Sequence, residues 1–281
     1  MRTRAFVALT TGALALTAVA VPAAHADDRP TGSALPFSSA SAAASAGGPK
    51  ISNVSVNGGK TVTVGVSKKT FTIKFTAKDP NGVKEGVAAL WRGGPDADRA
   101  EKLLSLAEFT NLANLCKRVN STTSHCTVKV LADPKAAYPE DDLGNTNAGR
   151  WNIAVYAKDK VGKETENQRY GTHYVKRAAK ATAKATPDPV KKGKTLTVAG
   201  SLTRANWDTN KYAGFAGQSV KLQFKKKGTG TWTTVKTVSS NSRGKVEATT
   251  KATSDGSYRF TYGGSTSTGS ASSKADAVDV T

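Results

Sequence analysis

The chain has 281 residues and carries 41 Lys and Arg against 21 Asp and Glu, a formal net charge of +20 at pH 7. Such a charge predicts attraction to polyanions, although a basic surface that only keeps a secreted protein soluble would have the same composition. The sequence contains no helix-turn-helix, zinc-finger or RNP-like pattern, so we expect no specific nucleic-acid partner.

Residues 1–26 have the pattern of a cleaved secretory signal peptide. Arg2 and Arg4 precede an apolar run, and the sequence AHA at residues 24–26 matches a cleavage site. The alternative, a transmembrane anchor, fits less well because the run ends in small residues. No later apolar run reaches about 18 residues, so the mature chain is not expected to span a membrane. We expect an extracellular protein in an oxidising compartment.

Residues 27–49, rich in Ala, Ser, Gly and Pro, are predicted to form a disordered leader. Over residues 50–177 the sequence changes to short runs in which apolar and polar residues alternate, separated by turn residues. In TFTIKFTAK, for example, Phe71, Ile73 and Phe75 share one face. About seven such strands predict an antiparallel β-sandwich. The leucines of residues 96–115 have roughly helical spacing, so we expect one short amphipathic helix inserted between strands.

Residues 178–190 contain lysines, alanines and two prolines, and we predict a linker there. Alternation resumes over residues 191–281, where Tyr258, Phe260 and Tyr262 share one face. The predicted fold class is therefore all-β, with two consecutive sandwiches and a short helix inserted in the first.

Two stretches carry a family resemblance. KDPNGVKEGVAALW (residues 78–91) and residues 217–265 resemble the tandem immunoglobulin-like domains of secreted actinobacterial proteins. The second stretch has the order V-x-L-x-F strand, Trp hairpin, S-x-G turn and D-G-x-Y-R. The resemblance implies two immunoglobulin-like sandwiches over most of residues 50–281. It implies no single function, because such modules serve in adhesion, as spacers or in ligand binding.

Both cysteines lie in the stretch CKRVNSTTSHC, with His125 directly beside Cys126. A structural zinc site needs four ligands, and these residues supply at most three. A reactive thiolate usually stands alone as the nucleophile. In an exported chain a Cys116–Cys126 disulfide is the best interpretation. We expect it to tie the inserted helix to a strand at 127–131 and to stabilise the fold by about 3 kcal/mol.

The sequence offers little for catalysis. The mature chain has only His125 and His173, and it lacks G-x-S-x-G, H-E-x-x-H and P-loop motifs. We therefore predict that the protein is not an enzyme. An extracellular glycan or ester hydrolase with paired carboxylates is the alternative.

A calcium site is a further hypothesis, and no other cofactor is expected. In immunoglobulin strand order, strands 70–78 and 149–158 run the same way, so the loops that follow them emerge at one end. Asp79, Asn81 and Asp159 could then place oxygens around one Ca²⁺. The alternative is a pair of ordinary Asx turns. The sequence has no EF-hand loop or glycine-aspartate nonapeptide array.

By the same argument, loops 203–217 and 263–275 share one end of the second sandwich. The first loop contains five candidate ligand-binding residues: Arg204, Trp207, Lys211, Tyr212 and Phe215. Their rings could stack on sugars and their cations could bind acidic groups; alternatively, the rings fold back onto the sandwich edge. The other tryptophans, Trp91, Trp151 and Trp232, are assigned to core or hairpin packing.

Taken together, the sequence predicts a secreted, non-enzymatic binding or structural protein of the cell surface or extracellular matrix. An anionic cell-wall polymer or polysaccharide is the candidate partner. A calcium-binding immunoglobulin-like protein is the first alternative function.

Overall fold

A computed structural model describes residues 36–37, 47–104, 106, 111–135 and 143–281. The predicted signal peptide and most of the predicted leader lie outside the described residues. Phe37, a described leader residue, is only 5% exposed and belongs to the hydrophobic cluster of the first sandwich. The prediction of a disordered leader is therefore wrong at Phe37, which packs against the first sandwich. In the described part of the chain, no helix has the length and apolar character needed to span a bilayer.

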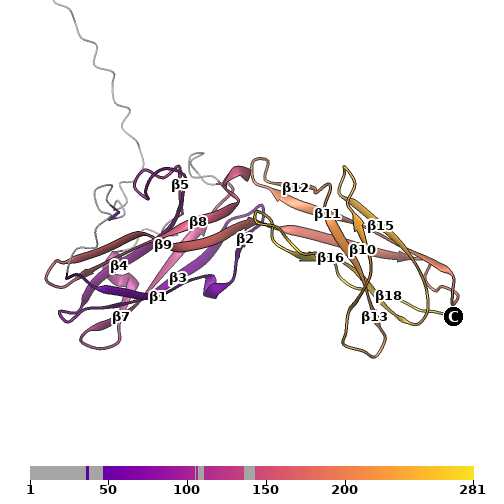
Figure 1. Ribbon diagram of the computed structural model, residues 1–281, viewed down its shortest axis with the longest axis horizontal. Coiled ribbons are helices and arrows are strands. Elements are labelled where there is room, and N and C mark those ends of the chain that lie inside the picture. Colours follow the sequence, from indigo (N-terminus) through magenta and orange to yellow (C-terminus); the bar gives the residue numbers. More distant parts are fainter. Residues whose placement is uncertain (1–35, 38–46, 105, 107–110, 136–142) are drawn as a thin grey trace, which may run out of the picture. The chain divides into compact units, whose positions relative to one another are not determined.

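The first half of the chain forms two sheets with the strand orders β1-β3-β7-β6 and β2-β9-β8-β4-β5 (Figure 1). The strands are β1 (Lys50–Val56), β2 (Val62–Val64), β3 (Lys69–Lys78), β4 (Val83–Arg92), β5 (Lys102–Leu104), β6 (Cys116–Arg118), β7 (Thr123–Ala132), β8 (Gly149–Asp159) and β9 (Glu164–Arg177). Short 3₁₀ turns are η1 (Asn57–Gly59), η2 (Leu112–Leu115) and η4 (Asn145–Asn147). Strands β3, β7 and β6 form one sheet, and β9, β8 and β4 the other, as in an immunoglobulin-type sandwich.

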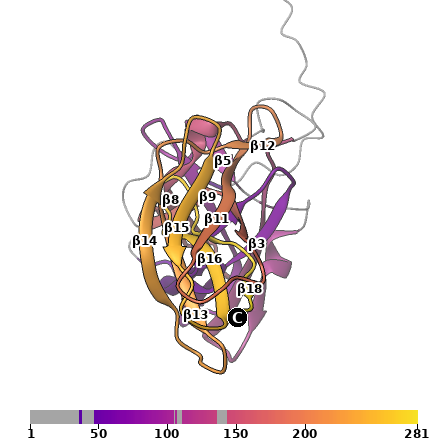
Figure 2. The same ribbon diagram turned by 90° about the vertical axis from the view of Figure 1, so that its right-hand side faces the viewer.

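The second half of the chain forms another pair of sheets. Its strands are β10 (Ala179–Thr186), β11 (Thr195–Asn206), β12 (Lys211–Gly214), β13 (Ser219–Lys226), β14 (Thr233–Ser239), β15 (Lys245–Lys251), β16 (Gly256–Tyr262), β17 (Ala271–Ser272) and β18 (Asp276–Val278). In one sheet β11 pairs with β10, β12 and β15. In the other, β13 pairs with β14 and β16 (Figure 2). Strand β16 also pairs with β17 and β18.

Residues 178–190, predicted to be a linker, contain strand β10. It pairs with β11 along its whole length, from Ala179 opposite Arg204 to Thr186 opposite Thr197. The lysines Lys180 and Lys184 are exposed, whereas Ala185 is buried in the second core. The alanines of β10 pack against the second core, but their side chains are too small to produce a clear hydrophobic alternation in the sequence. The strand therefore resembles a linker in composition.

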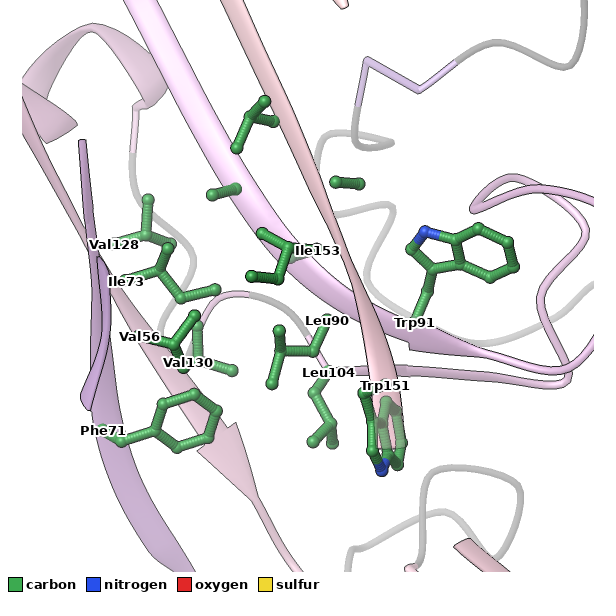
Figure 3. Close-up of a cluster of buried hydrophobic side chains, with 14 of the residues drawn as sticks. Val56, Phe71, Ile73, Leu90, Trp91, Leu104, Val128, Val130, Trp151 and Ile153 are labelled. Carbon is green, nitrogen blue, oxygen red and sulfur yellow. The ribbon is translucent and has the colours of Figure 1, made fainter. Parts of the chain in front are cut away.

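The core of the first sandwich follows from the alternation of the strands. On β3, Phe71, Ile73 and Phe75 are each at most 4% exposed, whereas Lys74 between them is exposed. Figure 3 shows Phe71 and Ile73 directed at the side chains of the facing sheet, including Leu90. Burying one such side chain stabilises a fold by about 1.5–3 kcal/mol.

Trp91 follows Leu90 on β4 and points to the opposite side of the strand (Figure 3). It is 1% exposed, and its indole Nε1 donates to the Gln168 carbonyl at 2.6 Å. The Arg169 guanidinium carbon lies 4.7 Å from the Trp91 ring centroid. The predicted burial of Trp91 is confirmed, and this sheet is covered on its outer face as well as its inner one at this point.

The amphipathic helix expected over residues 96–115 is not found in the described part of that segment. It contains strand β5, paired with β4, and only one 3₁₀ turn, η2. Gly93 and Gly94 have φ of 68° and 75°, and Pro95 follows them, so the chain turns sharply after β4. Leu104 is 5% exposed and Leu103 is 38% exposed, which is the alternation of a strand. In the described residues, the leucine spacing therefore belongs to a strand and a 3₁₀ turn and not to an α-helix.

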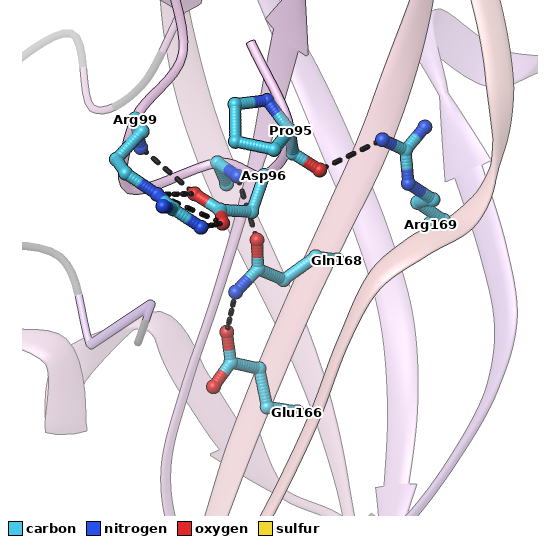
Figure 4. Close-up of polar contacts among 7 residues, drawn as sticks. Pro95, Asp96, Arg99, Glu166, Gln168 and Arg169 are labelled. Carbon is cyan, nitrogen blue, oxygen red and sulfur yellow. Dashed lines mark hydrogen bonds and ion pairs between the residues drawn. The ribbon is translucent and has the colours of Figure 1, made fainter. Parts of the chain in front are cut away.

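Polar side chains of β9 bind the loop at residues 95–99, which lies between β4 and β5 (Figure 4). The Ala97 amide donates to Gln168 Oε1 at 2.6 Å, and Arg169 Nη2 donates to the Pro95 carbonyl at 2.8 Å. Asp96 accepts from the Arg99 amide at 3.0 Å and pairs with its guanidinium. Asp96 thus closes a short loop.

Candidate functional site

The predicted disulfide between Cys116 and Cys126 is confirmed. The two residues face each other on β6 and β7, so the bridge joins neighbouring strands of one sheet and not a helix to a strand. Cys126 is 1% exposed, whereas the adjacent His125 is exposed on the other face. A Cβ atom built on Gly86 of the facing sheet would lie 2.9 Å from Cys116 Sγ and 3.2 Å from Cys126 Sγ. The bridge is therefore packed into the sandwich, and neither sulfur is a free thiol.

Neither His125 nor His173 contacts a nucleophile in the part of the chain that the structure describes. His125 makes no polar contact there. His173 lies half-buried within β9, with Nε2 3.2 Å from the Lys60 carbonyl oxygen. Burial lowers the pKa of His173, and the hydrogen bond to Lys60 opposes this shift. A Ser–His or Cys–His pair is thus not formed by these residues.

The loops after β3 and β8 meet at one end of the first sandwich, as the strand directions predicted. The Lys160 amide donates to the Gly82 carbonyl at 3.1 Å, and Asn81 Nδ2 donates to Asp159 Oδ2 at 3.3 Å. Asp79 and Asp159 are 2% and 0% exposed. The structure therefore brings the three residues of the calcium hypothesis together.

The oxygens of this cluster are largely engaged by the protein's own donors. Asp79 Oδ1 accepts from the Asn81 amide at 2.8 Å. Asp159 Oδ1 accepts from the amides of Val161 and Lys163 at 3.0 and 2.7 Å. Burial opposes ionisation of Asp159, but hydrogen bonds from Lys163, Asn81 and Val161 outweigh it and lower its pKa. These contacts are those of two Asx turns joined by an amide.

The loops predicted to form a ligand platform on the second sandwich face the first sandwich instead. Residues 203–217 form the end of β11, a tight turn and β12. Trp207 in that turn is 1% exposed and belongs to the first sandwich's hydrophobic cluster. Its Nε1 donates to the Val64 carbonyl at 3.3 Å. Trp207 is therefore a core residue and is not available to a ligand.

Hydrogen bonds surround Trp207 at this junction. Asn145 Oδ1 accepts from the Trp207 backbone amide at 2.9 Å, and Asn145 Nδ2 donates to Asn206 Oδ1 at 2.8 Å. The Asn145 backbone amide donates to Asp208 Oδ1 at 2.8 Å. Arg177, 8% exposed, donates from Nε to the Ala205 carbonyl at 2.6 Å. Burial lowers the pKa of Arg177 to about 10, with a further contribution from nearby Arg204.

The remaining platform residues do not form one surface. The Arg204 guanidinium carbon lies 4.0 Å from the Phe215 ring centroid, and its Nη1 donates to Thr268 Oγ1 at 3.3 Å. Phe215 packs against the second core, whereas Tyr212 packs against the first. Lys180 Nζ lies 3.9 Å from the Tyr212 ring centroid, and Lys211 is exposed. The contact of Arg204 with Thr268 confirms that the two predicted loops share one end.

A basic face on the first sandwich was not predicted as a site. The outward positions of β1, β3, β7 and β6 are brought together by the register that pairs Lys50 with Lys78, Ser55 with Lys74, Thr72 with Lys129 and Lys117 with His125. We call Lys50, Lys74, Lys78, Lys117 and Lys129 the lysine face. All five are exposed, and these four strands, which are described in full, contain no Asp or Glu.

A second basic face surrounds Trp232, which was assigned to core or hairpin packing. Trp232 is half-exposed and does not belong to either core cluster. The Arg259 guanidinium carbon lies 4.0 Å and Lys225 Nζ lies 5.2 Å from its ring centroid. Arg259 Nε donates to Gln223 Oε1 at 2.9 Å. The triple lysine before the hairpin was a visible signal for this face, but only the strand pairing brings Arg259 to it.

No protein-family model and no curated protein matches the chain. The D00–D0 domain of Intimin matches 80% of this chain and 99% of its own length, at 14% identity and a TM-score of 0.27. The mouse nectin-like molecule 4 ectodomain matches 83% of this chain at 12% identity and a TM-score of 0.24. PorU from Porphyromonas gingivalis matches 83% of this chain at 13% identity and a TM-score of 0.28. The chain spans 65% of the nectin-like ectodomain and 20% of PorU.

Proposed function

We propose that the protein is an extracellular, non-enzymatic binding module that associates with an anionic polymer of the cell surface or matrix. The observation that carries the proposal is the lysine face, where exposed ammonium groups gather on strands without a carboxylate. Within the described part of the chain, none of these lysines forms an ion pair. Their charge is therefore uncompensated, and a polymer with regularly spaced anions complements it. The buried disulfide supports an oxidising compartment.

The test is binding of the mature chain to immobilised poly(glycerol phosphate), with neutral dextran as a second matrix. We expect retention on the phosphate polymer at about 20 mM salt and loss at about 500 mM, because exposed charges are screened at high ionic strength. The variant Lys74→Gln/Lys129→Gln should weaken binding by about threefold to tenfold.

The matched control is Lys191→Gln/Lys192→Gln, which removes the same charge from an exposed turn between β10 and β11. It should change binding by less than about twofold if the lysine face is the contact surface. No retention at low salt, or equal retention on dextran, would reject the proposed function.

Calcium binding is a second candidate, favoured by the convergence of Asp79, Asn81 and Asp159. The donor set fits Ca²⁺ poorly, because this ion prefers six to eight oxygen ligands. In the described residues, no cluster of three acidic, histidine or cysteine side chains is arranged for a metal ion. Calorimetric melting with and without EDTA separates the candidates. An unchanged Tm supports two Asx turns, and a decrease in Tm that added Ca²⁺ reverses would support a calcium site.

A further inference from the structure

The face around Trp232 differs from the lysine face because its cations are held in a fixed geometry. Gln223 and Arg259 are partners in the β13–β16 register, so their side chains leave the same outer face of the sheet. Arg259 is stacked on Trp232 and anchored to Gln223 through Nε. A guanidinium fixed in this way loses little conformational entropy when it binds a partner.

The two Nη groups of Arg259 have no protein acceptor within the described part of the chain. They form a planar pair of donors, which matches the two oxygens of a carboxylate or a phosphate. Strands β13 and β16 contain no Asp or Glu that could take this place. The arrangement therefore presents a preformed pair of donors beside an aromatic ring.

A surface groove of about 360 Å³ is lined by Lys225 of this face and by Ser257, the partner of Lys225 in the β13–β16 register. Lys226 and Lys227 also line the groove, as does one carboxylate, that of Asp279. Lys227 is paired with Asp255 at 3.4 Å. Lys225 makes no ion pair in the described residues and lies against Trp232, so its ammonium is available next to the guanidinium.

We propose that Arg259, Lys225 and Trp232 form an oxyanion subsite for one repeating unit of an anionic polymer. This inference rests on the proposed function and sharpens it. The Arg259 fork binds two oxygens of a phosphate or carboxylate, Lys225 adds a second charge, and the exposed edge of Trp232 contacts the adjoining sugar or polyol. The lysine face attracts the polymer through charge alone, whereas this subsite selects the geometry of its oxyanion.

The critical variant is Arg259→Lys, which keeps the charge and removes the fork. Affinity for soluble poly(glycerol phosphate) should fall about tenfold at about 100 mM salt, because a charged hydrogen-bonded pair is lost. Lys225→Gln should lower it by about threefold, whereas Lys192→Gln in an exposed turn should change it by less than twofold. Equal Tm values for all variants will show that the fold is retained. Polygalacturonate replaces the phosphate polymer in a second series and distinguishes a carboxylate from a phosphate ligand.

The two proposals fail in different ways. If the wild-type chain binds the polymers but Arg259→Lys binds both with unchanged affinity, the subsite is overturned while the proposed function stands. If the wild-type chain binds neither polymer at low salt, the proposed function itself fails. A tenfold loss with either polymer supports the subsite and identifies the oxyanion that it prefers.

Discussion

Gly86 is the residue at which β4 makes room for the cystine of the opposite sheet. A Cβ atom there would lie 2.9 Å from Cys116 Sγ and 3.0 Å from Phe75 Cζ. We expect Gly86→Ala to destabilise the fold by about 1–3 kcal/mol, the usual effect of overpacking a core. Denaturant unfolding measures it. Gly230→Ala is the control, because its Cβ meets nothing within 4 Å, and equal effects of the two substitutions would contradict the packing described for Gly86.

His173 gives the fold a dependence on pH. Burial lowers its pKa below the ordinary value of 6.5, so the folded protein binds fewer protons than the unfolded one in the interval below pH 6.5. Stability is therefore full above pH 6.5 and declines as the pH falls through that interval. His173→Gln should reduce the difference between unfolding midpoints measured at pH 7.5 and pH 5.5. An unaltered difference would show that His173 does not contribute.

The β6–β7 hairpin is the element that the disulfide closes. Removing the bridge in Cys116→Ser/Cys126→Ser should lower the free energy of unfolding by about 3 kcal/mol, since the unfolded chain regains the freedom of the loop. Mass spectrometry after alkylation of the purified protein should find no free thiol before reduction. Two alkylated cysteines in the unreduced protein would contradict the bridge.

Sequence patterns predicted the strands with strong alternation well, because burial of every second side chain is a local property. Phe71, Ile73 and Phe75 are such a case. The segment after β4 was misinterpreted because leucines at positions 103, 106 and 112 also match a helical period, and the pairing of β5 with β4 is a long-range contact. Strand β10 was missed for the opposite reason, since alanines pack without a clear hydrophobic signal.

Candidate sites were predictable only where strand direction was enough to place them. The convergence of Asp79, Asn81 and Asp159 followed from two strands that run the same way. The burial of Trp207 and the exposure of Trp232 could not be predicted in this way, because both residues lie in polar, turn-rich stretches of the sequence. The contacts that bury Trp207 come from Val64 and Asn145, which are far away in the sequence.

At the scale of the molecule, Trp207 couples the second half of the chain to the core of the first sandwich. We expect Trp207→Ala to cost about 3–5 kcal/mol of stability, as for other buried aromatic residues. Trp232→Ala is the comparison, and it should cost less than about 1 kcal/mol because Trp232 lies half-exposed on an outer face. Chemical denaturation measures both. A loss at Trp207 no larger than that at Trp232 would contradict its place in the core.

The charge of the molecule is also organised at this scale. The strands that form the lysine face and the strands β13, β14 and β16 contain no carboxylate, whereas acidic side chains such as Asp79 and Asp159 are engaged in loops. The end of the second sandwich that the sequence favoured as a platform is occupied by the first sandwich. Binding is therefore expected on the sheet faces and not at the loop ends.

The most direct test of this account is residue-resolved NMR of the isotope-labelled protein titrated with poly(glycerol phosphate). The account predicts salt-sensitive shift changes at the lysine face and around Trp232 and Arg259, with Trp207 and its neighbours unaffected. Shift changes centred on residues 203–217, or no changes at low salt, would contradict it.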